Sequence, residues 1–178
     1  MIRFEDVIVQ IGDFQLTVNM TVPKGFTTVI GQSGAGKSTL LSLLSGHREL
    51  TSGKIFVDGT RVDLLPPFQR PCSTIFQEFN LFPHLTISQN LNLVCGKSFF
   101  VSDISREKIK KVLEKVGIVE LIDSLPSEMS GGQQSRAALA RVLLQENPIL
   151  LLDEPFSALG PNQKSELIEL SSKIEKNF

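Results

Sequence analysis

The sequence predicts an α/β fold that has an antiparallel β region at its amino terminus and a helical insertion in the middle. Apolar and polar residues alternate near the start of the chain, which is typical of half-buried strands. A β-branched run over 26–30 then leads through a glycine-rich stretch into a leucine-rich segment, as in a strand, loop and helix. From about residue 87 to 142 the apolar spacing becomes helical, which indicates the insertion.

Length and charge narrow the class of protein. The 178 residues are 41% hydrophobic, which fits one domain over 1–178 with a sizeable core. Eighteen Lys and Arg against 19 Asp and Glu leave a net charge of −1, so we expect no nucleic-acid partner. No apolar run approaches the roughly 18 residues of a membrane span, and residues 1–6 carry no secretory signal. Cys72 and Cys95 form no CxxC pair, and the expected compartment is the cytoplasm.

The first half of the chain supplies strands and one helix. Two short antiparallel strands are expected to meet at a Gly12-Asp13 turn. The strand over 26–30 is followed by a helix that should end at Gly46, because glycine is the usual residue just past a helix. Further strands are expected over 53–59, where an Asp-Gly pair makes a turn, and over 73–76.

The second half contributes the insertion and a buried strand. A helix is expected with Ile109, Val112 and Val116 on its buried stripe, and another should follow Ser130. The apolar run over 149–152 is typical of a parallel strand buried on both faces. A last helix is expected to begin near Pro161. The predicted core with its β subdomain covers 1–78 and 140–178, and the helical subdomain covers 79–139.

The glycine-rich stretch matches the pattern G-x-x-x-x-G-K-[ST] between a predicted strand and a predicted helix, which is the context of a phosphate-binding loop. Glycines let consecutive backbone N–H groups surround a phosphate, and the helix adds its positive end. Lysine directs a full charge to the β and γ phosphates, and serine offers its hydroxyl to Mg²⁺. The alternative, a ligand-free turn, would leave a lysine at the end of the helix dipole that disfavours cations. The candidate ATP-binding residues are Gly31, Gln32, Ser33, Gly34, Ala35, Gly36, Lys37, Ser38 and Thr39.

Two carboxylates follow the apolar strand at its carboxyl end, where open α/β sheets place their ligands. Asp153 is the candidate magnesium ligand, beside Ser38. Glu154 is the candidate group that orients or deprotonates an attacking water. Without a phosphate loop in the same chain, Asp-Glu-Pro would be interpreted as an ordinary strand-ending turn.

Between these motifs lies Ser130-Gly131-Gly132-Gln133, and here the sequence resembles the ATP-binding-cassette (ABC) ATPase family, with Met129 in place of the usual leucine. The resemblance implies the fold of that family and catalytic roles for Lys37, Gln77 and Glu154. It implies that Gln77 contacts Mg²⁺ and water, and that the stretch from Ser130 binds ATP held by a second subunit. A head-to-tail homodimer with sandwiched ATP is therefore expected. A serine before a helix is also an ordinary cap, which is the alternative interpretation.

The segment from Leu81 to Asn90 resembles that of bacterial importer ATPases, where it contacts the membrane permease. This resemblance implies a peripheral subunit at the cytoplasmic face of the inner membrane. Its partners would be integral-membrane permease subunits and, through them, a periplasmic or extracellular substrate-binding protein. The stretches 65–71 and 125–130 are most similar to those of thiamine importers. Importers of sulfate, molybdate, iron or polyamines remain alternatives.

Three departures from the family pattern affect these expectations. Ile11 or Val9 stands where the family has an aromatic residue against adenine, with Phe14 as a candidate substitute or a core residue. Gly160 stands where the family has aspartate. The sequence ends at Phe178, before the strand and histidine that the resemblance implies, so we expect a fold that is incomplete at its carboxyl end. The alternatives are a hydrolysis-impaired nucleotide-binding module and a soluble ABC ATPase without a transport role.

Overall fold

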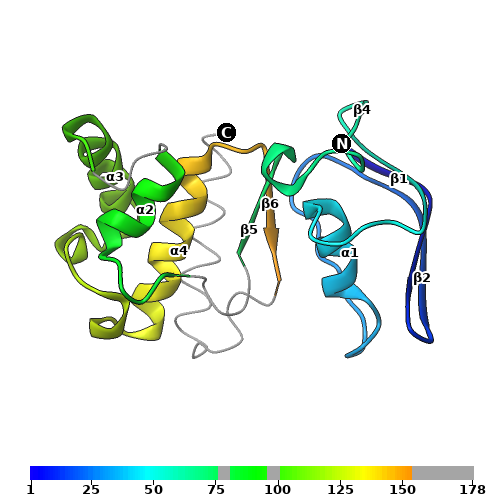
Figure 1. The fold of residues 1–178 in the computed structure, drawn as a ribbon, viewed down its shortest axis with the longest axis horizontal. Helices are drawn as coiled ribbons and strands as arrows, with labels where there is room; N and C mark the ends of the chain where they lie inside the picture. Colours follow the sequence, from blue (N-terminus) through cyan, green and yellow to red (C-terminus); the bar gives the residue numbers. More distant parts are fainter. Residues whose placement is uncertain (76–80, 96–100, 154–178) are drawn as a thin grey trace. The chain divides into compact units, whose positions relative to one another are not determined.

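The computed structural model describes residues 1–75, 81–95 and 101–153 (Figure 1). The chain divides into two compact units, Met1–Cys72 and Ser73–Phe178. Each unit is described by itself.

The first unit contains an antiparallel sheet of four strands in the order β2-β1-β3-β4. A long hairpin forms its start, and Ile11 and Phe14 are paired where the strands join, so the predicted Gly12-Asp13 turn is confirmed. Asp58 and Gly59 both have positive φ, 46° and 84°, as a tight hairpin turn requires. The strands are β1 (Ile2–Ile11), β2 (Phe14–Val22), β3 (Ser52–Val57) and β4 (Thr60–Arg61).

A bulge in β1 sets the inward face of this sheet. The register between β1 and both neighbours shifts near Asp6, whose φ is +45°. The bulge places extra residues in β1 and thereby returns the following side chains to the inner face of the sheet. Phe4, Val7 and Val9 are therefore all buried. Ile55 and Val57 of β3 are buried as well.

The helix α1 (Lys37–Ser45) ends as predicted, because Gly46 adopts a left-handed conformation with φ 80°. The strand predicted over 26–30 is wrong: this segment forms no strand, and Phe26 and Ile30 are 74% and 90% exposed. The sheet of the first unit already pairs β1 on both sides and does not include this segment. A β-branched sequence favours an extended backbone but does not supply a partner strand.

The second unit is mainly helical. Its helices are α2 (Ile87–Cys95), α3 (Asp103–Val116) and α4 (Gly131–Gln145), and α4 contacts both others. Ile109 and Val116 are fully buried and Val112 is buried as well, so the predicted stripe of α3 is confirmed, and Leu113 also belongs to the buried face. Short 3₁₀ turns over Val119–Leu121 and Pro126–Glu128 connect α3 to α4, as the green to yellow ribbon of Figure 1 shows. In the described ranges, no helix combines the length and apolarity that crossing a bilayer requires.

Two short strands, β5 (Cys72–Ile75) and β6 (Ile149–Leu152), pair with each other. The backbone N–H of Asp153 donates to the carbonyl of Ile75 at 3.2 Å, so the two strands end side by side, as parallel neighbours do. Leu151 is buried, whereas Leu150 is 36% exposed. The prediction that β6 is buried on both faces is therefore wrong for Leu150.

Candidate nucleotide-binding site

The glycine-rich loop of the first unit has the local conformation that a phosphate cradle needs. Gly34 and Gly36 have φ of +80° and +93°, which a side chain would disfavour. A turn forms where the N–H of Ala35 donates to the carbonyl of Gln32 at 3.2 Å. A Cβ added at Gly34 would meet open space. This side of the loop can therefore accept a bulky group.

Lys37 is the first residue of α1 and folds back over the loop. Its Nζ donates to the carbonyl oxygens of Gly31 at 2.9 Å and Gln32 at 2.8 Å. These two bonds use two of its three donors and hold the charge above the loop. The ammonium is thereby close to any anion that the loop binds.

The start of α1 leaves positive potential for an external ligand. Its N-cap, Gly36, has no side chain to accept hydrogen bonds, and its first turn contains no acidic residue. The first N–H groups of a helix have no intrahelical acceptor, and an anion satisfies them. Loop, helix start and lysine thus fit a triphosphate, and the Ser38 hydroxyl is of a type that Mg²⁺ binds.

Phe14 lies at the foot of this loop. A Cβ built on Gly36 would be 3.0 Å from Cζ of Phe14 and 3.3 Å from Leu16. Phe14 is half-buried and belongs to the sheet face that carries Leu16 and Val18. The ring therefore supports the backbone at the start of α1.

The signature stretch begins α4 in the second unit. The hydroxyl of Ser130 accepts from the N–H of Gln133 at 3.3 Å, and the Gln133 side chain accepts from the N–H of Ser130 at 2.8 Å. This reciprocal capping box fixes the start of the helix. Ser130 and Gly131 are both exposed. The first-turn N–H groups of Gly131 and Gly132 point out of the amino-terminal end of α4.

Asp153 directly follows β6 and is half-buried. Its backbone bond to Ile75 holds it beside the end of β5. The other predicted catalytic residues, Gln77 and Glu154, lie outside the described residues, as do Gly160 and the helix expected near Pro161. Among the described residues, no three His, Cys, Asp or Glu side chains gather as a metal cluster.

Two buried polar side chains organise these units and were not singled out from the sequence. Arg70 is 6% exposed and bonds to backbone carbonyls around the end of α1. Asn90 is fully buried and holds the loop before α2. Both lie in stretches that carry the family resemblance, Arg70 in 65–71 and Asn90 in 81–90, but the sequence analysis assigned neither side chain a role.

A lysine-closed glycine loop at the start of a helix, in an α/β chain, defines a P-loop nucleotide-binding protein. The family model described as "ABC transporter" matches residues 16–157. The chain belongs to the ABC transporter family. This assignment confirms the prediction of an ABC-type ATPase with the corresponding fold.

Named relatives agree with the family. The chain is 43% identical to the thiamine import ATP-binding protein ThiQ of Ruegeria sp. (strain TM1040), over 98% of this chain and 76% of that protein. It is 42% identical to ThiQ of Escherichia coli (strain K12), over 97% and 75%. With ThiQ of Haemophilus influenzae the identity is 43%, over 98% and 81%.

Solved structures confirm the fold. The dimeric post-hydrolysis structure of the ATP-binding cassette MJ0796, bound to ADP and Pi, matches with a TM-score of 0.83 and 27% identity. The match covers 99% of this chain and 84% of that one. The ATP-binding cassette MJ1267 matches with a TM-score of 0.87 at 23% identity, over 99% and 77%. This second likeness shows the fold alone.

Proposed function

We propose that this chain is the ATP-binding and ATP-hydrolysing subunit of a bacterial importer that takes up thiamine. The observation that carries the ATP site is the loop over 31–38, in which Lys37 bonds to the carbonyls of Gly31 and Gln32. Support for the cargo comes from the thiamine import proteins that are 42–43% identical over nearly the whole chain. The experiment must distinguish import of thiamine from import of another small solute.

The residues would divide the chemistry as follows. The backbone of 31–36 and Lys37 would hold the phosphates, and Ser38 and Asp153 would hold Mg²⁺. A bound Mg²⁺ neutralises charge on the β and γ phosphate oxygens. Gln77 would contact the metal and a water molecule, and Glu154 would orient that water and accept its proton.

A second copy of the chain would complete each site. The exposed Ser130 and Gly131 at the start of α4 offer N–H groups suited to an anion. In a head-to-tail homodimer, the stretch from Ser130 to Gln133 would contact ATP held by the partner's loop. A dimeric cassette among the similar structures supports this arrangement.

The partners outside the dimer would be integral-membrane permease subunits, and through them a substrate-binding protein on the other side of the membrane. The chain would then act as a peripheral subunit at the cytoplasmic face of the inner membrane. Within it, residues 1–78 and 140–178 would form the nucleotide-binding core and 79–139 the helical subdomain. Closing of the dimer on ATP and opening after hydrolysis would drive the permease.

The test is uptake of labelled thiamine by vesicles that contain the chain, its permease and its substrate-binding protein. Vesicles with wild-type protein should release phosphate and accumulate thiamine when Mg-ATP is supplied on the side of the membrane to which this chain is bound. Lys37→Ala should do neither, whereas Lys24→Ala, which removes an exposed lysine paired with Asp58, should do both. Phosphate release without thiamine uptake would contradict the cargo, and absence of phosphate release would contradict hydrolysis.

A further inference from the structure

Arg70 places a buried guanidinium at the carboxyl end of the helix that begins with Lys37. Its Nη1 donates to the carbonyls of Leu43 at 3.5 Å and Leu44 at 3.4 Å. Both residues belong to the last turn of α1. In the part of the chain that the structure describes, Arg70 forms no salt bridge, so its polar partners there are carbonyl oxygens.

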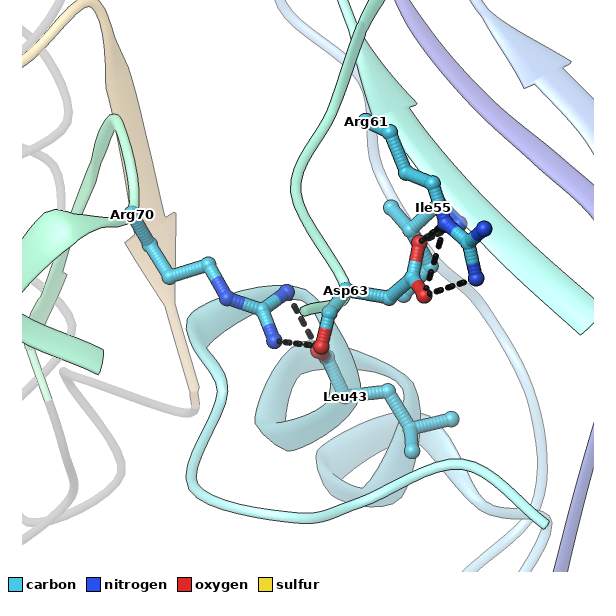
Figure 2. Close-up of polar contacts among 5 residues, drawn as sticks. All are labelled: Leu43, Ile55, Arg61, Asp63 and Arg70. Carbon is cyan, nitrogen blue, oxygen red and sulfur yellow. Dashed lines mark hydrogen bonds and ion pairs between the residues drawn. The ribbon is translucent and has the colours of Figure 1, made fainter. Parts of the chain in front are cut away.

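The same side chain binds the segment that precedes it. Nε donates to the carbonyl of Leu65 at 2.8 Å, and Nη2 donates to the carbonyl of Asp63 at 2.9 Å. Figure 2 shows the guanidinium between Asp63 and the end of α1. The planar group thus joins two segments through all three of its nitrogens, which a lysine ammonium could not reproduce.

Asp63 extends this link to the sheet. Its carboxylate accepts from the backbone N–H of Ile55 in β3 at 2.9 Å and from Nη2 of Arg61 at 2.9 Å (Figure 2). The Asp63 side chain is 4% exposed. Burial raises the pKa of this carboxyl, but the bonds from Arg61 and Ile55 outweigh it and the net pKa is lowered. A continuous polar connection therefore runs from β3 through Asp63 and Arg70 to α1.

The carboxyl end of α1 is held by backbone bonds and by Arg70 together. The N–H of Gly46 donates to the carbonyl of Leu43 at 3.4 Å, and the N–H of Arg48 donates to the carbonyl of Ser42 at 3.2 Å. The helix has nine residues, with a left-handed glycine at each end and no side-chain cap at the start. The last carbonyls of any helix lack intrahelical donors, and a cation suits the negative end of the dipole. Arg70 adds donors to the carbonyls of Leu43 and Leu44 and connects this end of the helix to the segment over 63–65.

We propose that Arg70 is a positioning residue for the phosphate loop: by anchoring the far end of α1, it sets where Lys37 and Ser38 stand relative to the rest of the nucleotide site. This inference rests on the proposed function. The loop binds phosphates by its local backbone, so Arg70 should matter little for holding ATP. It should matter for hydrolysis, because that step requires the phosphates to be aligned with groups from other elements.

The test compares Arg70→Gln and Arg70→Lys with wild type by calorimetry and by steady-state ATP hydrolysis. Both variants should bind Mg-ATP with unchanged stoichiometry and a Kd within about threefold of wild type, while kcat falls roughly ten- to hundredfold. Arg61→Gln is the matched control, because it removes an arginine from Asp63 and leaves the Arg70 contacts with α1 in place. It should retain kcat. A loss of kcat that is matched by a loss of affinity or of binding stoichiometry, or an unchanged kcat, would overturn the proposal.

A second measurement uses the unmutated protein and covers the case in which the variants do not fold. The side-chain Nε–H resonance of Arg70 is followed by NMR while Mg-ADP is added to saturation. The resonance should exchange slowly with solvent and shift on nucleotide binding, although Arg70 lies at the end of α1 opposite the loop. An unshifted resonance with bound nucleotide would overturn the proposal. Failure of wild type to bind nucleotide would instead contradict the proposed function, and binding without hydrolysis would contradict the hydrolysis alone.

Discussion

The ammonium of Lys37 donates to the carbonyl oxygen of Gly31 at 2.9 Å, so the last part of the loop is bonded to the first. This bond and the one to Gln32 fix the cation above the cradle. A preorganised charge costs less to align on binding than a mobile one. The glycine conformations on which the cradle depends can be tested individually.

Gly36→Ala should disturb the loop by two effects. The φ of +93° is strained for alanine, and the new methyl would lie 3.0 Å from Cζ of Phe14. We expect a loss of roughly 1–3 kcal/mol in the free energy of unfolding, together with weaker Mg-ATP binding. Urea unfolding and calorimetry measure the two quantities. Gly12→Ala is the control, since its φ is +56° but no atom lies within 4 Å of the added Cβ. Equal nucleotide affinity in Gly36→Ala and wild type would refute the role of this conformation.

A comparison of Gly53→Ala with Gly59→Ala measures the steric cost of an added Cβ separately from the cost of a positive φ. The φ values of the two glycines are similar, +95° and +84°, but a Cβ at Gly53 would clash with the carbonyl oxygen of Asp6 at the β1 bulge. At Gly59 nothing lies within 4 Å. Gly53→Ala should therefore lower the free energy of unfolding by about 2 kcal/mol or more beyond Gly59→Ala. Similar urea midpoints for the two variants would contradict this prediction, because they would show that the backbone at the β1 bulge shifts to accommodate the methyl group at little cost in stability.

Asn90 should be intolerant of a carboxylate. Its Oδ1 accepts from the N–H of Phe82 at 2.7 Å, and its Nδ2 donates to the carbonyls of Phe82, Leu85 and Thr86. In Asn90→Asp the charged group would face these carbonyls without donors, and we expect a loss of about 2–4 kcal/mol at pH 7. The loss should shrink at low pH, where a protonated carboxyl can donate again.

The control for this change is Gln89→Glu, an exposed neighbour whose Oε1 accepts from the N–H of Thr86 at 2.9 Å and which keeps its acceptor. Thermal unfolding from pH 4 to 8 provides the comparison. Asn90→Asp with the stability and pH profile of Gln89→Glu would show that the loop over 82–86 does not depend on the Asn90 donors.

The thiol of Cys72 should lower the free energy of unfolding at alkaline pH. Burial raises the pKa of its thiol to about 11, although nearby Arg70 acts to lower it. The unfolded thiol ionises from about pH 8.5, so unfolding is favoured as pH rises from there toward 11. Because the sulfur is partly exposed, the expected loss is about 1–2 kcal/mol. Urea midpoints of wild type and Cys72→Ala between pH 8 and 10.5 test this, and parallel profiles would contradict it.

The features that the sequence predicts correctly are local. The Gly12-Asp13 hairpin, the end of α1 at Gly46 and the start of α4 after Ser130 each depend on residues within one turn. Local conformation determines such signals. The phosphate loop is also a local feature, because its glycines and Lys37 lie within the eight-residue motif over 31–38.

The features that the sequence did not predict depend on partners far along the chain. The run over 26–30 has strand propensity, but pairing requires a strand that local sequence cannot specify. Leu150 belongs to an apolar run, and its exposure depends on what covers β6. Arg70 contacts Leu43 and Leu44, 27 and 26 residues away, and Asp63 reaches back to Ile55. A single arginine between two apolar stretches carries no sign of such contacts.

Titration of the folded chain with Mg-ATP, followed by calorimetry in parallel with Lys37→Ala and Lys24→Ala, tests the central claim most directly. Wild type and Lys24→Ala should give a saturable heat with one nucleotide per chain, and Lys37→Ala should bind at least about tenfold more weakly. Absence of heat in folded wild type, or equal affinity in Lys37→Ala, would contradict the claim that the loop over 31–38 binds the triphosphate.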